Sequence, residues 1–258
     1  MADTGSQGSS LTADNQKIWE AGPQTFVDER VQTILDLLPH LGPAARIVDI
    51  GCLDGTLTRL YAERIGTRDV HGVDVALNES AAAKGIAVTP FDLNATEPLP
   101  FPDGHFDVVL CVETLEHVYP TDHLLAEIMR VLKSGGLAVI DVPRLDSFLN
   151  IGLLLLGFQP PGVECSRVRR YGSINNDSVL TGHVAYFTRR ALLAMIQAAG
   201  FAIRDVRQVG QRSGWMKLQE VQGKSVSLLV RMIWWIYDAL SLKKEYLIVI
   251  ANKASASR

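Results

Sequence analysis

The stretch Val48-Asp49-Ile50-Gly51-Cys52-Leu53-Asp54-Gly55-Thr56-Leu57-Thr58 is the most informative part of this chain of 258 residues. It begins in a short, largely apolar run from Arg46 to Ile50, which predicts a buried strand. From Leu57 onward, apolar residues recur three and four positions apart, as on one face of a helix. Gly51 and Gly55 lie between the two patterns, where the backbone must turn sharply and can approach a ligand closely. The stretch predicts a strand, a nucleotide-binding turn and a helix.

The spacing of the glycines indicates which kind of nucleotide would bind. A dinucleotide turn has the spacing Gly-x-Gly-x-x-Gly, whose middle glycine lets a pyrophosphate lie against the backbone. Leu53 stands in the place of that glycine, which disfavours a diphosphate. Asp74 ends the next strand pattern, 19 positions after Gly55, and an acid about 20 positions on commonly binds the ribose hydroxyls. The predicted ligand is a nucleoside without a diphosphate.

Further motifs follow in a fixed order along the chain. They are a strand before Phe91-Asp92-Leu93, a strand Phe106–Cys111 before Val112-Glu113-Thr114-Leu115-Glu116-His117, a helix from Leu124 to Leu132 before Gly135-Gly136, and Gly182 to Thr188 before a helix ending at Gly200. With this set, roughly residues 25–252 resemble the class I S-adenosylmethionine-dependent methyltransferases. The resemblance is greatest to the ubiquinone-type O-methyltransferases and the MetW-like proteins.

This resemblance implies S-adenosylmethionine as the cofactor and gives a role to each residue at the strand ends. Asp49 is expected near the amino-acid end of the cofactor, Asp74 on the ribose and Asp92 on the adenine. The other implied cofactor-binding residues are Gly51, Cys52, Gly55, Val75, Leu93, Val112 and Glu113. Capping of strand ends is the alternative reading of Asp49 and Asp74. Cys52 is read as a small residue beside the cofactor in preference to a nucleophile.

The alternation of strand and helix patterns through Pro143 predicts an α/β fold with a doubly wound, mostly parallel sheet. The resemblance implies seven strands, of which the last, Glu245 to Ala251, is antiparallel. A hydrophobic content of 47% suffices for one large core. We expect a polar, disordered tail over residues 1–15 and a single domain over 16–258, with a leading helix from Trp19 to Leu38.

Charge and cysteine content narrow the functional class. Residues 1–143 carry 21 acidic and 9 basic residues, whereas residues 144–217 carry 4 and 10. The whole chain has a net charge of −3, a weak electrostatic footprint for nucleic acid. Three cysteines without metal spacing fit a reducing compartment, and no secretory signal pattern opens the chain, so the cytoplasm is expected.

Residues 144–187 break the alternating pattern and are predicted to form an insertion on the substrate side of the site. Two apolar runs, Phe148–Phe158 in the insertion and Val226–Leu240 beyond it, favour packing in the protein first, and a substrate tunnel or membrane-surface contact second. A membrane span is disfavoured because a span needs about 20 apolar residues. Arg144 is read as a structural ion-pair partner, or alternatively as the partner of an anionic substrate.

Glu113, Glu116 and His117 have the spacing i, i+3 and i+4, which would place them on one face of a helical turn. In some relatives a matching Glu-x-x-Glu-His binds a divalent cation, and His183 would then be a fourth ligand or a general base. A local role without metal is the favoured reading. His117 and His183 are the candidate catalytic residues.

The predicted function is methyl transfer to a small or medium-sized organic molecule, apolar or anionic, with O-methylation ahead of N- or C-methylation. An RNA 2′-O-methyltransferase and a non-catalytic, cofactor-binding regulatory protein are the alternatives. The sequence makes no prediction of the oligomeric state.

Overall fold

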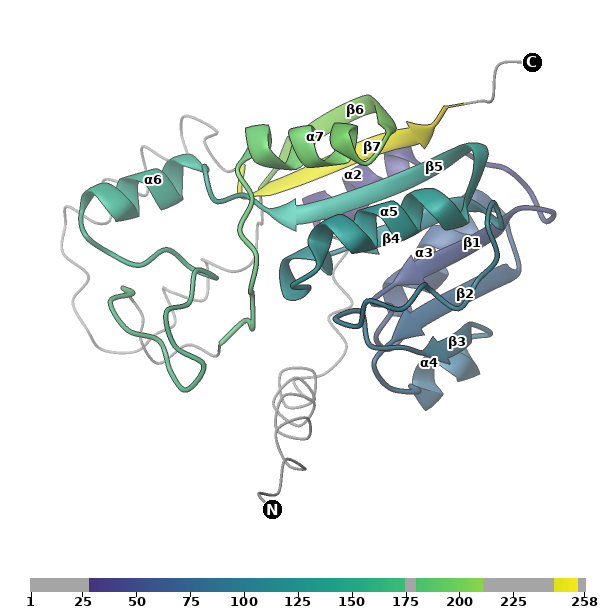
Figure 1. The fold of residues 1–258 in the computed structure, drawn as a ribbon, viewed down its shortest axis with the longest axis horizontal. Coiled ribbons are helices and arrows are strands. Elements are labelled where there is room, and N and C mark those ends of the chain that lie inside the picture. Colours follow the sequence, from purple (N-terminus) through teal and green to yellow (C-terminus); the bar gives the residue numbers. More distant parts are fainter. Residues whose placement is uncertain (1–27, 175–179, 211–243, 255–258) are drawn as a thin grey trace.

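The computed structural model describes residues 28–174, 180–210 and 244–254 (Figure 1). The strands are β1 (Arg46–Ile50), β2 (Asp69–Asp74), β3 (Ala87–Pro90), β4 (Phe106–Val112), β5 (Leu132–Pro143), β6 (Phe201–Val209) and β7 (Tyr246–Lys253). The helices are α2 (Glu29–Leu37), α3 (Thr56–Ile65), α4 (Glu79–Ala83), the short 3-10 helix η1 (Leu115–His117), α5 (Thr121–Val131), α6 (Phe148–Leu155) and α7 (Arg189–Ala198).

The seven strands form one sheet in the order β3-β2-β1-β4-β5-β7-β6. Strands β1 to β5 pair in parallel, whereas β7 is antiparallel to both of its neighbours. This confirms the predicted doubly wound α/β fold with an antiparallel last strand. The strand order reverses between β1 and β4, and in such sheets a crevice for ligands opens beyond the carboxyl ends of the two strands at the reversal.

Successive side chains of each strand enter two separate cores, one on each face of the sheet. Val48 and Val109 belong to a buried cluster with side chains of α5 and α7. Their neighbours Ile47 and Val108 belong to a second cluster with side chains of α2 and α3. Figure 1 shows α5 and α7 in front of the sheet and α2 and α3 behind it. Burial on both faces explains why these strands are nearly continuous apolar runs.

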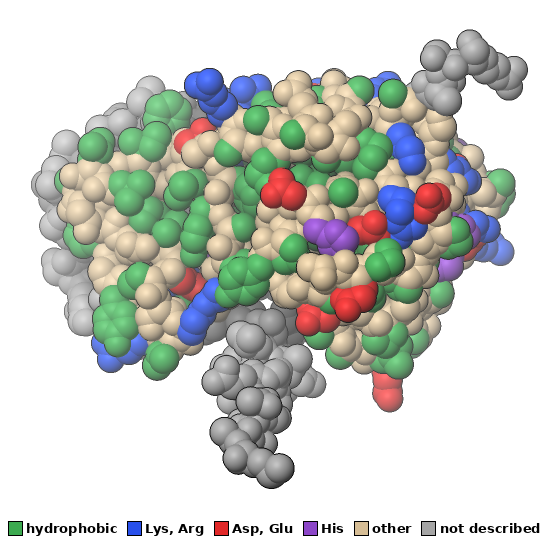
Figure 2. All heavy atoms as spheres, viewed as in Figure 1, with side chains coloured by type: hydrophobic (Ala, Val, Ile, Leu, Met, Phe, Trp, Pro, Cys, Tyr) green, Lys and Arg blue, Asp and Glu red, His purple; other side chains and the backbone are tan. Residues whose placement is uncertain are grey.

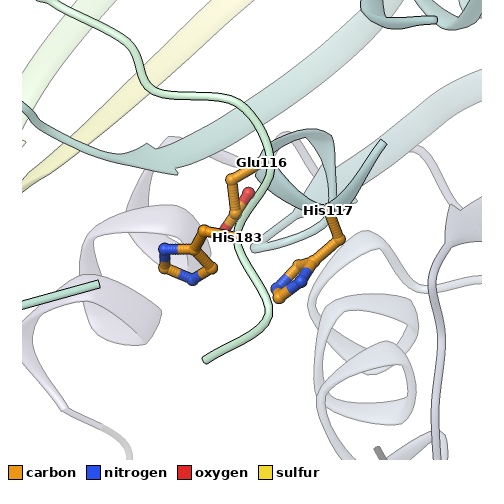
Figure 3. A group of neighbouring side chains, drawn as sticks. All are labelled: Glu116, His117 and His183. Atoms are coloured by element: carbon orange, nitrogen blue, oxygen red, sulfur yellow. The ribbon is translucent and has the colours of Figure 1, made fainter. Parts of the chain in front are cut away.

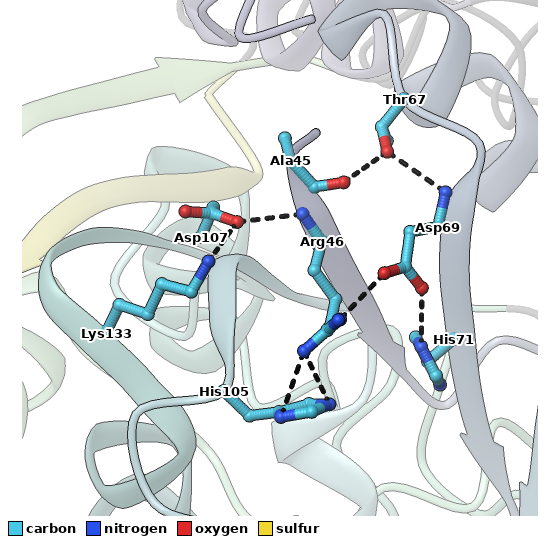
Figure 4. Close-up of polar contacts among 8 residues, drawn as sticks. All are labelled: Ala45, Arg46, Thr67, Asp69, His71, His105, Asp107 and Lys133. Atoms are coloured by element: carbon cyan, nitrogen blue, oxygen red, sulfur yellow. Dashed lines mark hydrogen bonds and ion pairs between the residues drawn. The ribbon is translucent and has the colours of Figure 1, made fainter. Parts of the chain in front are cut away.

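A polar network closes the edge where the strands begin (Figure 4). Nε of Arg46 lies 2.7 Å from Oδ2 of Asp69. Oδ2 of Asp107 accepts hydrogen bonds from the Arg46 N–H at 2.8 Å and from Nζ of Lys133 at 2.7 Å. Because ligands bind at the opposite edge of a parallel sheet, we assign this network to the pairing of β1, β2 and β4.

The boundaries of the leading helix and of the fifth strand are among those that differ from the sequence prediction. The leading helix is described from Glu29, and the earlier part of the predicted Trp19–Leu38 helix lies outside the described residues, as do the tail 1–15 and the apolar run Val226–Leu240. The glycine turn expected before the fifth strand lies inside β5. There the pairing with β4 shifts register, because Leu132 pairs with Phe106 and Leu137 with Val108.

We predict that Gly51→Ala destabilises the protein far more than Gly85→Ala. Both glycines have φ near +80°, but a Cβ on Gly51 would overlap the Thr114 side chain, whereas a Cβ on Gly85 meets no atom within 4 Å. The strained backbone costs about 1–2 kcal/mol at either position, and the overlap adds about 1–3 kcal/mol at position 51. Urea unfolding of the two variants measures the difference, and equal losses would contradict this account of the turn.

Candidate active site

The turn after β1 is held by the neighbouring strand β2. The N–H groups of Gly51 and Cys52 donate to the carbonyl oxygen of Val73 at 2.7 and 3.2 Å. The N–H of Leu53 donates to Oδ2 of Asp74 at 2.9 Å. These hydrogen bonds within the protein restrain the turn, and a restrained binding loop loses less conformational entropy when a ligand binds.

Asp74 and Asp92 follow the same pattern at neighbouring strand ends. Asp74 also accepts from the N–H of Val75 at 2.7 Å, and Asp92 accepts from the N–H of Asn94 at 2.9 Å. For Asp74, the capping contacts that the alternative reading expected are thus present. A carboxylate has about four acceptor positions, so both acids keep free positions for a ribose or an adenine amino group. Their assignment to the cofactor stays a prediction.

Asp49 lies beneath the turn, with 5% of its surface exposed. Oγ1 of Thr58, in the first turn of α3, donates a hydrogen bond to Oδ2 of Asp49. Burial, opposed by the hydrogen bond from Thr58 and assisted by the nearby charge of Asp74, raises the pKa of Asp49 from 3.8 to about 7. A costly buried acid at this place is typical of a functional site.

Cys52 is a packing residue in this turn. A Cβ on Gly72 of β2 would overlap its Sγ, so the cysteine side chain fits against β2 only because residue 72 is glycine. Burial, and secondarily the charges of Asp49 and Asp74, raise the pKa of the Cys52 thiol to about 12. The thiol stays protonated, which excludes the nucleophile reading. A backbone contact between Cys52 and the cofactor stays a prediction.

Backbone strain is concentrated at the strand reversal. Among the described residues, the non-glycine residues with positive φ are Leu53, at 49°, and Glu113, at 53°. They lie in the turns after β1 and β4, the adjacent central strands. Such conformations cost of order 1–3 kcal/mol each and persist where the surroundings fix them. Their placement at the crevice is what a preformed ligand site requires.

A buried ion cluster joins α2 to the ends of β4 and β5. Nη1 of Arg30 lies 3.0 Å from Oδ2 of Asp141 and 3.7 Å from Oε1 of Glu113, and the Arg30 guanidinium stacks 5.1 Å above the Tyr246 ring. Burial raises the pKa of both carboxyl groups against the opposing charge of Arg30. Sequence reasoning missed Arg30 and Asp141, which lie 111 positions apart and share no motif.

The expected common face of Glu113, Glu116 and His117 is not formed. Glu113 precedes η1 and its carboxylate turns toward Arg30, because its positive φ redirects the chain there. Glu116 and His117 lie in η1, a 3-10 helix of three residues. His183, from the insertion, joins them instead, and the ligand atoms of Glu116, His117 and His183 all lie within 4.8 Å of one another (Figure 3).

Glu116 is 1% exposed, and neither of its side-chain oxygens has a hydrogen-bond partner among the described residues. Burial and the charge of Glu113 raise its pKa well above the ordinary value of 4.5. The rings of His117 and His183 meet edge to face, with centroids 4.9 Å apart. Burial, and then the neighbouring His117, lower the pKa of His183 to about 3, so this ring is neutral.

These groups border a hollow at the junction of the sheet and the insertion. Glu116 and His183 line it together with Pro143, Arg144, Leu145, Asn150, Pro161, Gly162, Val163, Ala185, Tyr186 and Phe187. Most of this lining belongs to residues 144–187, as the predicted substrate side would require. The lining combines apolar side chains with the polar side chains of Glu116, Arg144, Asn150, His183 and Tyr186.

Arg144 ties the insertion to the sheet, and Glu164 joins two parts of the insertion to each other. The Arg144 guanidinium bonds to Asp146, Gln208 and the carbonyl oxygen of Lys244. Oε2 of Glu164 accepts from the N–H of Gly182 at 3.0 Å, beside His183. Arg144 is therefore the structural ion-pair partner of the first reading, and its donors are engaged within the protein.

All the residues predicted to bind the cofactor lie in or directly after β1, β2, β3 and β4, at one edge of the sheet. This fold, together with the family match and relatives that follow, identifies a class I S-adenosylmethionine-dependent methyltransferase. The methyltransferase domain family matches residues 24–206, and the chain belongs to it.

Individual relatives agree on this class. The chain is 37% identical over 110 residues to the ubiquinone/menaquinone biosynthesis C-methyltransferase UbiE of Burkholderia mallei, covering 39% of this chain and 44% of UbiE. It spans about two fifths of the length of the curated relatives it matches, 41% and 44% for the first two.

Solved structures share the fold. An S-adenosylmethionine-dependent methyltransferase of Mesorhizobium loti superposes with a TM-score of 0.58 and 21% identity, covering 86% of this chain and 95% of that one. A 1,6-didemethyltoxoflavin-N1-methyltransferase of Burkholderia thailandensis, solved with its substrate and S-adenosylhomocysteine, superposes with a TM-score of 0.54 and 17% identity, covering 94% and 84%.

We predict that Asp49→Asn stabilises the protein at high pH. The folded state holds the Asp49 proton up to about pH 7 and the unfolded state only to about pH 4, so the wild type loses stability as the pH rises between these values. The advantage of the variant should grow over the same window to at most about 4 kcal/mol above pH 7. Thermal or urea unfolding at several pH values tests this, and a difference independent of pH would contradict it.

Proposed function

We propose that the protein transfers a methyl group from S-adenosylmethionine to a hydroxyl oxygen of a small or medium-sized organic molecule. The observation that carries the proposal is the buried carboxyl group of Glu116 at the hollow, which has no hydrogen-bond partner among the described residues. An unpaired buried polar group costs about 1–3 kcal/mol or more, so a retained one favours a ligand that pairs with it. A hydroxyl group is such a ligand.

The bound cofactor supplies a methyl group on a positively charged sulfur, which leaves as a neutral thioether. The residues of this chain must align the acceptor with that methyl group, and alignment is the larger contribution to the rate. In the proposed arrangement Glu116 accepts a hydrogen bond from the acceptor hydroxyl, while the apolar wall of Pro161, Val163 and Phe187 holds the rest of the molecule.

The hydroxyl proton must leave as the carbon–oxygen bond forms. His183, one of the two candidate bases, holds a proton too weakly to be a good acceptor, since its pKa is lowered to about 3. Glu116 in its ionised form is the stronger base and takes the hydroxyl proton, because burial and the charge of Glu113 raise its pKa. We therefore give His117 and His183 the role of positioning the acceptor beside Glu116.

We also propose that residues 16–258 act as one domain whose insertion, 144–187, selects the acceptor. The cytoplasm is the proposed location. All three cysteines are free thiols and Cys52 and Cys111 are buried, which supports a reducing compartment.

Glu116→Gln tests the proposed site. Calorimetry with S-adenosylhomocysteine should show binding to both the wild type and the variant, and ligand at ten times its dissociation constant should stabilise each by about 1.4 kcal/mol. With isotope-labelled cofactor and a metabolite extract, the wild type should form a methylated product and the variant should form about a hundredfold less.

Glu127→Gln is the matched control. Glu127 is a buried acid that bonds to Arg130 and to the Leu99 N–H, remote from the hollow. The Glu127→Gln variant should be less stable than the wild type and should form the same amount of product. Absence of cofactor binding would refute the methyltransferase proposal. Full activity of Glu116→Gln would refute only the role of Glu116. A product methylated on nitrogen or carbon would refute O-methylation.

A divalent cation is a second candidate ligand of the same hollow. The carboxylate of Glu116 and the rings of His117 and His183 could hold it, and a set with two imidazoles suits Zn²⁺ better than Mg²⁺. A metal there would polarise an acceptor hydroxyl and lower its pKa. Glu113, named for this site from the sequence, lies with Arg30 instead.

Calorimetric titration of protein first treated with a chelator distinguishes a metal site from a site that binds the acceptor hydroxyl directly. If the cluster is a metal site, Zn²⁺ should release heat and bind more tightly than Mg²⁺, and His183→Ala should weaken binding at least tenfold, since one of three protein ligands is lost. Absence of heat with either ion would reject the metal. Equal affinity in His183→Ala would place any ion elsewhere.

A further inference from the structure

The exposed hydrophobic side chains of the described residues are gathered on one segment. Of 14 such large side chains, nine lie between Phe148 and Ile174. Six of these are on α6 or directly after it: Phe148, Ile151, Leu154, Leu155, Leu156 and Phe158. Figure 2 shows hydrophobic side chains spread over the lobe that carries α6 in Figure 1.

This helix is far more apolar than its packing requires. Leu153 is its buried residue, whereas Leu155 is 82% exposed. Phe148, Ile151 and Leu155 are spaced i, i+3 and i+7, so they share one face that points away from the core. Soluble proteins rarely expose a contiguous apolar patch without a partner for it. The segment is therefore built to contact something outside the described fold.

The charges beside this face indicate the kind of partner. The one acid between positions 148 and 174, Glu164, has a side chain only 2% exposed and engaged by Arg170. Arg167 and Arg169 are exposed, and Arg169 stacks 4.9 Å above the Tyr171 ring. All exposed charge on the segment is thus positive, although the whole chain has a net charge of −3.

We propose that residues 148–174 dock onto the surface of an anionic lipid bilayer. Apolar side chains with flanking arginines and a tyrosine are the pattern of helices that lie in a membrane interface. A second copy of the chain fits less well, because a symmetric contact would bring Arg167 and Arg169 of both copies together. The described residues contain no helix long and apolar enough to cross a membrane, so the contact is at the surface.

The position of residues 148–174 places the proposed membrane contact next to the candidate active site. Asn150, Pro161, Gly162 and Val163 belong to the same segment and line the hollow beside Glu116. A bilayer held against α6 would thus lie next to the acceptor side of the site, where it could deliver an apolar acceptor. The docking proposal itself does not depend on which molecule is methylated.

Co-sedimentation of the full-length protein with lipid vesicles tests the proposal. Binding should be strong to equal mixtures of phosphatidylcholine and phosphatidylglycerol, and weak to phosphatidylcholine alone. Replacing both Arg167 and Arg169 by glutamine should reduce the partition coefficient on the mixed vesicles by about fivefold per arginine.

A matched pair of leucines tests the apolar face. Leu156 and Leu77 are each 67% exposed, the first on the proposed surface and the second outside it. Leu156→Glu should reduce vesicle binding at least tenfold, whereas Leu77→Glu should not change it. Absence of binding, equal binding to both vesicle types, or equal loss in the two variants would overturn the proposal. A dimer in sedimentation velocity that Leu156→Glu dissociates would also overturn it, in favour of a second copy of the chain.

Discussion

Buried carboxyl groups at one edge of the sheet are the constraint on which the rest of this structure depends. Asp49, Glu116 and Asp141 are each 5% exposed or less, and the guanidinium of Arg30 pairs with Asp141 alone among these three. Removing a carboxylate from water is unfavourable unless it is paired, so protons are retained to a higher pH. In the proposed arrangement a positively charged cofactor would offset this cost, since a sulfonium and an ammonium group are suitable partners for such acids.

The sheet topology explains why the acids meet. Parallel strands bring their carboxyl ends to the same edge. At the reversal between β1 and β4, the connections that follow the two strands run in opposite directions and leave a crevice between them. The turns after β1 and β4 lie so close together that a Cβ on residue 51 would overlap the Thr114 side chain. Leu53 and Glu113 absorb the remaining strain at positive φ. A rigid edge of this kind holds its donors and acceptors in place before any ligand arrives, as efficient catalysis requires.

The sequence allowed prediction of those features that depend on neighbouring residues. The limits of β1 are as predicted, because an apolar run bounded by Arg46 and Gly51 is a local signal. Asp74 was selected by its spacing from Gly55, whereas Asp49 and Asp92 were selected by the family resemblance. Contacts between distant segments could not be found in this way. Arg30 meets Asp141 only because α2 packs across the sheet, and a single sequence carries no signal for that pair.

Only part of the cluster of Glu116, His117 and His183 could be predicted, because a single sequence does not show contacts between distant segments. Glu116 and His117 are adjacent, but His183 reaches them through the insertion, whose backbone is fixed when the N–H groups of Val184 and Ala185 donate to the Glu116 carbonyl oxygen at 2.7 and 3.0 Å. The same insertion engages Arg144 internally, so this arginine offers no free charge to an anionic acceptor. A hollow with a buried acid and neutral imidazoles, bordered by an apolar segment, favours an acceptor that is uncharged, largely apolar and equipped with a hydrogen-bond donor.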